Sequence, residues 1–400
     1  MNILQINHLY RPFGGGERYL LDLCNILEES GHGTVIVSSR HPQNYHIKGR
    51  KEYFIDGSFG LKSGLKMWKV VRDIVRLENP HLIHFHETLA FLSPFILRRL
   101  MRLKPTIQTL HTAFYFCPKT TKILPNRDIC FYAMGFKCIT NGCLPEINLR
   151  LALNMLWRKW VTAKADRVVV PSLYIKEEAV RNGIASEKVA VIPHFTEKNL
   201  QNKYVEPEGS SILFMGRTDP LKGIHELIAA LNLIKEKTWK AYILGIGDDL
   251  NEYEKMAQDM GIKARIMFLN NLDYADLDKY YQRASVVVFP SMSPESFGLV
   301  GIEAMSFGRP VVAFDVGGPR EWLVDEKTGF LVKRGDVKGL SLRINQFLED
   351  ASLAKQMGLE GQRRVNRRYR KEIHLKRLLT IYEEALETRR QKDWRKGDVT

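Results

Sequence analysis

Two glutamates in the second half of the chain have the type and spacing of polar-ligand contacts. Glu295 lies in a polar turn after the β-branched run 286–290, and Glu303 follows with seven residues between them, on an otherwise apolar helical segment. Carboxylates accept hydrogen bonds from hydroxyl groups, so Glu295 suits a sugar and Glu303 a ribose diol. A charge that complements a helix dipole explains Glu295 without any ligand, but not Glu303.

Backbone amides and two cations close to these glutamates could bind a diphosphate. The N–H groups of Phe297, Gly298 and Leu299 lie just before the helix predicted at 301–307, and helix N-termini bind anions. Arg217 and Lys222 flank a glycine-bearing turn between a predicted strand and helix. Fixed cations stabilise a leaving group that gains negative charge, which elsewhere is the task of a divalent metal. The alternative for this turn is a solvated loop.

A glycine turn and a histidine are the candidates in the first half. Gly15 and Gly16 open a helix after the first predicted strand, where amides can approach a donor phosphate or contact the acceptor, although a plain tight turn is the alternative. The dinucleotide fingerprint fails because its third glycine is absent. His111 ends a predicted strand and could reach a sugar hydroxyl or the reacting centre; otherwise it is a structural histidine.

Two acidic or histidine-rich patterns are discounted as catalytic metal sites. His84 and His86 alternate along one strand beside Glu87, and a buried role in that strand is favoured over a metal because no third ligand apart from the adjacent Glu87 is evident nearby. The Asp-Leu-Asp run at 276–278 starts an amphipathic helix, where acids favour the N-terminus in any case. We therefore predict no catalytic metal and no required cofactor.

The elements that position these residues alternate between strands and helices. Such alternation predicts an α/β fold with a doubly wound parallel sheet in each half, and ligands then bind beyond the carboxyl ends of the strands. Strands are predicted at 2–9, 34–39, 82–86, 106–111, 167–172, 188–193, 212–216, 241–245, 265–269, 286–290 and 310–314. Helices are predicted at 17–30, 64–78, 223–237, 276–284 and 301–307.

A chain of 400 residues is too long for one core. The polar stretch 196–211 reads as a linker, so we expect a first domain at 1–196 with a cysteine-bearing insertion at 113–146, and a second at 210–375. A charged helix at 376–400 follows.

The segment 291–332 resembles the signature of glycosyltransferase family 4, which has the GT-B fold. The resemblance rests on the two glutamates, the Gly-Arg-Pro-Val-Val run at 308–312 and the glycine pair at 317–318, and it extends from the glycine turn to the last helix. It implies two Rossmann-like domains that face across a cleft, a retaining mechanism, and a last helix that crosses back onto the first domain.

The same resemblance implies roles for individual residues. Arg217 and Lys222 would bind the diphosphate, and Glu303 the ribose. Glu295 would lie at the donor sugar, with the glycine loop near the transferred group. His111 fits the family pattern at the edge of the cleft.

Four cysteines fall within the insertion. Their spacing contains no C-x-x-C pair, which argues against a zinc ribbon, and the alternatives are a structural metal site, free thiols or, least favoured in a reducing compartment, a disulfide. The four are Cys117, Cys130, Cys138 and Cys143.

The charge is unevenly spread. The net charge is +15, and residues 1–200 hold 28 Lys and Arg against 16 Asp and Glu. Basic amphipathic stretches at 62–76 and 147–164 either cover the sheet or dock on anionic lipid. With no signal peptide or membrane span in view, we expect a cytoplasmic protein that contacts the inner face of the membrane peripherally.

The leading hypothesis is therefore a metal-independent, retaining hexosyltransferase. It would move a hexose or hexose derivative from a nucleoside-diphosphate sugar to a glycan or lipid-linked acceptor in cell-surface polysaccharide synthesis. The alternatives are a nucleotide-sugar epimerase or phosphorylase of the same fold, and a basic module that binds nucleic acid. The last leaves both glutamates unexplained, so no nucleic-acid partner is expected.

Overall fold

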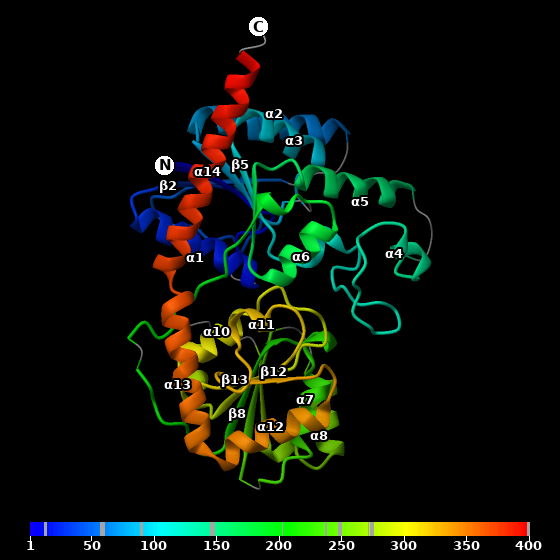
Figure 1. The fold of residues 1–400 in the computed structure, drawn as a ribbon, viewed down its shortest axis with the longest axis vertical. Helices are drawn as coiled ribbons and strands as arrows, with labels where there is room; N and C mark the ends of the chain where they lie inside the picture. Colours follow the sequence, from blue (N-terminus) through cyan, green and yellow to red (C-terminus); the bar gives the residue numbers. More distant parts are fainter. Residues whose placement is uncertain are drawn as a thin grey trace. The chain divides into compact units, whose positions relative to one another are not determined.

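The computed structural model describes residues 1–11, 14–56, 61–88, 91–144, 149–201, 203–236, 238–246, 250–270, 272 and 276–397. The chain divides into two compact units (Figure 1). Unit 1 comprises Met1–Pro193 and His374–Thr400, and unit 2 comprises His194–Ile373. Among the described residues, none of the helices has both the length and the apolarity that crossing a bilayer requires.

Unit 1 contains a seven-stranded sheet in the order β3-β2-β1-β4-β5-β6-β7, and neighbouring strands pair in parallel. Its strands are β1 Asn2–Ile6, β2 Gly33–Ser39, β3 Lys51–Ile55, β4 Leu82–Phe85, β5 Thr106–Thr109, β6 Arg167–Val170 and β7 Val189–Val191. Its helices are α1 Gly15–Glu29, α2 Leu61–Glu78, α3 Pro94–Leu103, η1 Ala113–Phe116, α4 Lys137–Thr140, α5 Leu149–Thr162, α6 Leu173–Arg181 and η2 Ser186–Lys188.

Unit 2 contains a six-stranded parallel sheet in the order β10-β9-β8-β11-β12-β13. Its strands are β8 Ser211–Arg217, β9 Lys240–Ile246, β10 Ile266–Asn270, β11 Val286–Phe289, β12 Val311–Phe314 and β13 Gly329–Val332. Its helices are η3 Pro220–Lys222, α7 Ile224–Leu231, α8 Asn251–Asp259, η4 Lys263–Arg265, α9 Leu277–Arg283, α10 Leu299–Ser306, α11 Pro319–Trp322, α12 Val337–Glu349 and α13 Ala351–Arg368. The last helix, α14 Lys371–Gly397, begins in unit 2 and continues in unit 1.

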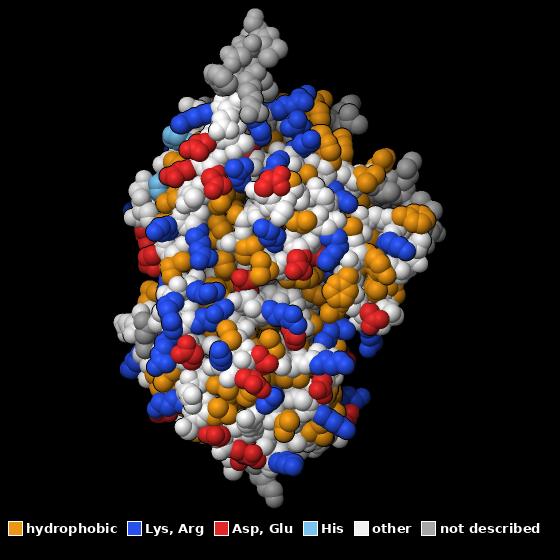
Figure 2. All heavy atoms as spheres, viewed as in Figure 1, with side chains coloured by type: hydrophobic (Ala, Val, Ile, Leu, Met, Phe, Trp, Pro, Cys, Tyr) orange, Lys and Arg blue, Asp and Glu red, His pale blue; other side chains and the backbone are white. Residues whose placement is uncertain are grey.

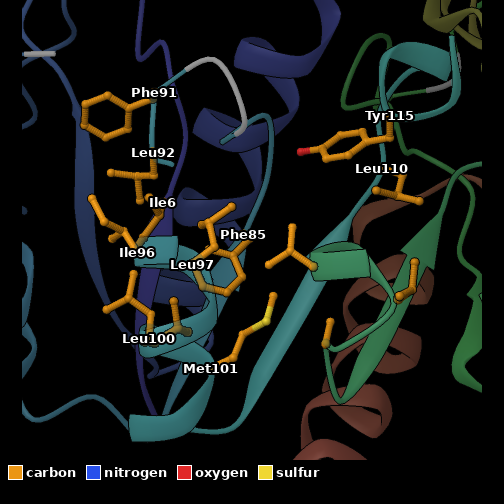
Figure 3. Packing of buried hydrophobic residues seen from close by; sticks show 14 of the residues in the cluster. Ile6, Phe85, Phe91, Leu92, Ile96, Leu97, Leu100, Met101, Leu110 and Tyr115 are labelled. Carbon is orange, nitrogen blue, oxygen red and sulfur yellow. The ribbon is translucent and has the colours of Figure 1, made fainter. Parts of the chain in front are cut away.

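The central strands of each unit are buried in its core, which is why their sequences are continuous apolar runs. Helices cover the sheet, so a central strand such as β11 is buried along its whole length. In unit 1, Leu97 and Leu100 of α3 pack with Phe85 of β4 in the main cluster (Figure 3). The sequence prediction of a doubly wound α/β fold in each half is confirmed.

Two strands lie outside the predicted set. The strand β3 is at the edge of its sheet and is half-exposed, and its sequence Lys-Glu-Tyr-Phe-Ile has only three consecutive apolar residues, too few to indicate a buried strand. The strand β13 has only four residues and begins at Gly329 directly after a turn. Several predicted strands also end earlier than expected; β5 ends at Thr109, so His111 lies beyond the strand rather than at its last residue.

Candidate functional site

The order of strands in unit 2 reverses between β8 and β11, and the predicted donor-binding residues gather there. The first three strands of the unit, β8, β9 and β10, follow one another from the middle of the sheet to one edge. The next three, β11, β12 and β13, follow one another from the middle to the other edge. The turns after β8 and β11 lie at the carboxyl ends of these neighbouring strands, where open α/β sheets bind ligands. They are joined by the bond from the Met292 N–H to the Leu221 carbonyl, at 2.8 Å.

An ion pair links these two turns. The Lys222 ammonium donates to Glu295 Oε1 at 2.5 Å, and the Ser291 hydroxyl donates to the same oxygen at 2.6 Å. The side chains of Lys222 and Glu295 are only 20% and 15% exposed. The two residues therefore have defined positions, and their opposite charges lie at one point of the sheet edge.

Arg217 adds a second cation at the end of β8. Its side chain is 66% exposed, and its nearest carboxylate is Asp219 at 3.8 Å, a separation at which the attraction is weak. Asp219 in turn accepts from the Leu221 N–H at 2.9 Å and so shapes the turn. The exposed and weakly paired guanidinium is accessible to an anion.

The segment that carries Glu295 is supported from behind by the glycine pair. The Gly318 N–H donates to the Glu295 carbonyl at 2.7 Å, and a Cβ on Gly318 would lie 2.5 Å from Phe297 Cα. Phe297 is buried, and its carbonyl accepts from the Trp322 indole at 2.6 Å. Gly298 follows with φ +90° and leads into α10, which begins at Leu299. The first N–H groups of this helix have no partners within the helix.

Glu303 lies one turn into α10 and is buried. Its Oε2 accepts from the Tyr281 hydroxyl of α9 at 2.8 Å. A carboxylate held in place in this way is a preorganised acceptor for a diol. The sequence did not single out Tyr281, because nothing in the spacing of α9 relates it to a glutamate 22 residues later.

In unit 1 the strand order reverses between β1 and β4, and the glycine turn lies there. Gly14, with φ +87°, is the N-cap of α1, and Gly15 is the first residue of the helix. A Cβ on Gly16 would lie 3.8 Å from the His111 ring. The two predicted site residues Gly16 and His111 are thus neighbours, and Gly15 lies beside them.

His111 belongs to a buried network of imidazoles. His86 Nε2 lies 2.8 Å from Gln5 Oε1, and His86 Nδ1 lies 2.9 Å from His111 Nε2. Burial lowers the pKa of His111 to about 3. Its imidazole is therefore neutral near pH 7 and acts as a hydrogen-bonding group rather than as a cation.

The neighbouring strand histidine has a structural role. His84 bonds the hydroxyls of Thr109 at 2.7 Å and Tyr382 at 2.9 Å, and burial lowers its pKa well below the ordinary value. This agrees with the predicted buried role. Within the part of the chain that the structure describes, no three His, Cys, Asp or Glu side chains are grouped as metal ligands.

Glu87, which the sequence considered only as a metal ligand, lies at the same sheet edge. It follows β4, and its carboxylate accepts from the Thr112 hydroxyl at 3.1 Å. Burial raises the pKa of Glu87 to about 8, and the nearby Glu17 carboxylate contributes to the increase. A carboxyl group that is protonated near neutral pH can donate as well as accept, which suits contact with sugar hydroxyls.

Comparison with known proteins agrees with this geometry. Residues 13–199 match the family model described as Glycosyltransferase Family 4, and residues 196–364 match the model described as Glycosyl transferases group 1. The chain belongs to the family 4 glycosyltransferases.

Similar proteins of known name include enzymes of lipid and polysaccharide glycosylation. The chain is 28% identical to a phosphatidyl-myo-inositol mannosyltransferase of Mycolicibacterium smegmatis, over 92% of this chain and 90% of that protein. It is 27% identical to the capsular polysaccharide biosynthesis glycosyltransferase CapM of Staphylococcus aureus, over 54% of this chain and 61% of that protein.

Solved structures share the fold. Sucrose-phosphate synthase of Thermosynechococcus elongatus superposes with a TM-score of 0.74 at 22% identity, covering 96% of this chain and 98% of that one. Anabaena HepE, solved in complex with UDP and glucose, superposes with a TM-score of 0.72 at 21% identity, covering 96% and 100%. The predicted GT-B class, with two Rossmann-like parallel-sheet units, is confirmed.

The cysteines of this glycosyltransferase are free thiols. Cys138 and Cys143 pack with Met134 and Met155 in a small apolar cluster. Burial raises the pKa of both thiols, so they remain protonated near neutral pH. The structural metal site considered from the sequence stays a prediction.

The acidic pair at 276–278 starts a helix, as predicted. Asp276 is the N-cap of α9 and pairs with Lys279 at 3.0 Å. Asp278 pairs with Lys198. Both carboxylates therefore have cationic partners within the glycosyltransferase itself.

We expect Glu87→Gln to change how the stability of the glycosyltransferase depends on pH. A carboxyl group whose pKa is raised by folding stabilises the folded state below its ordinary pKa near 4.5, and this contribution is lost as the pH rises through about 8. Glutamine stays neutral, so the melting temperature of the variant should fall less than that of the wild type across this interval. Thermal melts at several pH values measure it, with the exposed Glu177→Gln as control. Parallel pH profiles for both proteins would show that Glu87 does not titrate in this interval.

Proposed function

We propose that this glycosyltransferase moves a hexose or hexose derivative from a nucleoside-diphosphate sugar to a glycan or lipid-linked acceptor. The single observation that carries the proposal is the meeting of Lys222 and Glu295 at the point where the strand order of unit 2 reverses. One turn offers cations to a diphosphate, and the other offers a carboxylate to sugar hydroxyls.

The donor would be bound by charge and by fixed acceptors. Lys222 and the exposed Arg217 would contact the diphosphate, together with the N–H groups at the start of α10. Glu303, held by Tyr281, would accept from the ribose hydroxyls. These contacts would leave Glu295 to accept from the transferred sugar.

Unit 1 would supply the acceptor side. The Gly15–Gly16 turn, neutral His111 and Glu87 lie at the carboxyl edge of its sheet, where hydroxyl groups can be bound without a formal charge on the imidazole. A neutral imidazole carries no positive charge that would attract a diphosphate. It would therefore position a hydroxyl rather than stabilise the leaving group.

The reaction would retain the anomeric configuration. In the version that we propose, the acceptor oxygen bonds to the anomeric carbon on the face that the diphosphate leaves. The bond from that carbon to the diphosphate oxygen breaks, and the acceptor proton passes to the departing diphosphate. Lys222 and Arg217 would stabilise the negative charge that develops there, so no metal ion would be needed.

The named relatives support these substrate classes. The Mycolicibacterium relative is a mannosyltransferase of phosphatidyl-myo-inositol, and CapM acts in capsular polysaccharide biosynthesis. HepE was solved with UDP and glucose. By analogy we place this chain in cell-surface polysaccharide synthesis, in the cytoplasm and at the inner face of the membrane.

Incubation with a panel of nucleotide sugars tests the proposal. We expect one donor to raise the melting temperature and to release its nucleoside diphosphate when an acceptor is added, in the presence of a chelator. Activity that the chelator abolishes and manganese restores would contradict metal independence. Turnover without acceptor would favour an epimerase, and dependence on inorganic phosphate would favour a phosphorylase.

A further inference from the structure

The helix α5 turns an apolar stripe toward solvent. Leu153, Leu156, Trp157 and Trp160 are between 44% and 59% exposed. Their spacing of three, one and three residues places them on one face of the helix. The opposite face, with Met155 and Thr162, is buried. A surface helix normally buries its apolar stripe, so an exposed stripe of this kind indicates a binding surface.

Two neighbouring helices extend this stripe and surround it with cations. The Arg98 guanidinium of α3 lies 5.5 Å from the centre of the Trp160 ring of α5. Arg99, the next residue, lies 5.3 Å from the Trp68 ring of α2 and 4.2 Å from Phe95. These contacts tie the three helices into one surface, which we call the α2–α3–α5 face.

The α2–α3–α5 face carries positive charge with little negative charge. The sequences of α3 and α5 contain no Asp or Glu, and each contains several Arg or Lys residues. On α2, Asp73 pairs with Arg72 and Glu78 with Lys51, while Lys66 and Lys69 are exposed. Figure 2 shows hydrophobic and basic side chains side by side over the region where Figure 1 places these helices.

We propose that the α2–α3–α5 face docks on an anionic lipid bilayer. Tryptophan and leucine side chains would enter the boundary between headgroups and acyl chains, and the arginines and lysines around them would meet lipid phosphates. Arg98 lies over the Trp160 ring and Arg99 over the Trp68 ring, so their positive charges would lie at the same depth in the bilayer as these rings. The place of this surface in delivering a lipid-linked acceptor rests on the proposed function; the binding to lipid does not.

A bilayer explains the combination better than a protein partner does. The cores of protein interfaces are depleted in charged residues, and lysine is depleted across such interfaces, whereas Lys66, Lys69 and Lys164 lie on or beside the α2–α3–α5 face. Interfacial helices that lie on membranes instead combine Trp and Leu on one face with Lys and Arg beside them. The charge and the apolar stripe of this face match that pattern.

Vesicle sedimentation with the full chain tests the proposal. We expect binding to phosphatidylcholine vesicles that contain phosphatidylglycerol to be about tenfold or more tighter than to phosphatidylcholine alone, and to weaken with salt. The W157Q/W160Q variant should lose about tenfold in binding, because both rings lie in the exposed stripe. Tryptophan fluorescence of the wild type should shift to shorter wavelength on the anionic vesicles.

Matched variants make the result decisive. Leu342→Gln removes a side chain that is 65% exposed in unit 2, and it should bind vesicles as the wild type does. R98Q/R99Q should lose the preference for phosphatidylglycerol, with melting temperatures measured for every variant. Wild type that leaves anionic vesicles unbound, or W157Q/W160Q that sediments like L342Q, would overturn the proposal. A dimer that W157Q/W160Q dissociates, without vesicle binding, would assign the face to self-association.

The vesicle test is separable from the transferase proposal. The W157Q/W160Q variant should keep the thermal shift that a nucleotide sugar produces in the wild type. If the wild type binds vesicles but no nucleotide sugar, the proposed function fails and the lipid-binding surface stands. If the wild type binds a nucleotide sugar but no vesicles, the proposed lipid-binding surface fails and the proposed function stands.

Discussion

Replacing Lys222 by alanine should lower kcat/KM for the sugar donor by about 10²–10³-fold while the chain stays folded. The proposed role of Lys222 is to stabilise charge that develops on the leaving diphosphate, and removing a donor of that kind costs about 3–4 kcal/mol of transition-state stabilisation. The Lys222 side chain is only 20% exposed and pairs with Glu295, so its loss should also lower the melting temperature, and activity is measured well below that temperature. Release of nucleoside diphosphate, measured at subsaturating donor, gives the ratio.

Controls must separate the lost cation from its effect on Glu295. Removing Lys222 leaves the Glu295 carboxylate with the Ser291 hydroxyl but without the ammonium that now neutralises it. If K222A acted only by displacing Glu295, the K222A/E295Q double variant would be no less active than E295Q; we expect it to be less active than either single variant. Lys338→Ala, at an exposed position of the same unit, should behave as the wild type does. Full activity in K222A would refute the proposed diphosphate site.

The sequence predicted the arrangement of the sheets well because parallel strands covered on both faces read as β-branched runs. The run Val286–Phe289 is such a strand, and the end of this run also indicated where the polar turn that carries Glu295 begins. The edge strand Lys51–Ile55 was not predicted. One side of an edge strand meets solvent, so its sequence lacks the long apolar run that marks a buried strand. Helix starts differ from the prediction by one or two residues where glycines, rather than polar caps, precede or begin α1, α7 and α10, and α7 ends at Leu231, six residues before its predicted end.

The site was partly predictable for a related reason. Lys222 and Glu295 each lie in a turn that follows a strand, and parallel strands end at one edge of the sheet. Their positions along the chain therefore predicted that both lie at this edge. Their direct pairing depends on β8 and β11 being neighbours, which the order of elements alone does not specify. The bond between Tyr281 and Glu303 and the raised pKa of Glu87 arise from packing and burial, and these have no signature in spacing.

Gly223→Ala should be among the most damaging single changes in unit 2. Gly223 ends the turn that carries Lys222, has φ +77°, and lies so close to β11 that a Cβ would be 1.8 Å from the Pro290 carbonyl oxygen. The left-handed conformation alone costs a residue with a side chain about 1 kcal/mol. The clash with rigid backbone adds overpacking of about 1–3 kcal/mol, so we expect the melting temperature to fall by about 5–10 °C.

Gly261→Ala is the matched control, because Gly261 has φ +71° but open space where its Cβ would lie. It should show the conformational cost alone, and it should keep full activity. Gly223→Ala should also lose activity well below its melting temperature, because relief of the clash moves the turn away from Pro290 and so moves Lys222 away from Glu295. Equal melting temperatures and activities for the two variants would mean that the turn does not need its close approach to the neighbouring strand. The ion pair between Lys222 and Glu295 would then not depend on Gly223, and other contacts would have to position Lys222 in the diphosphate site.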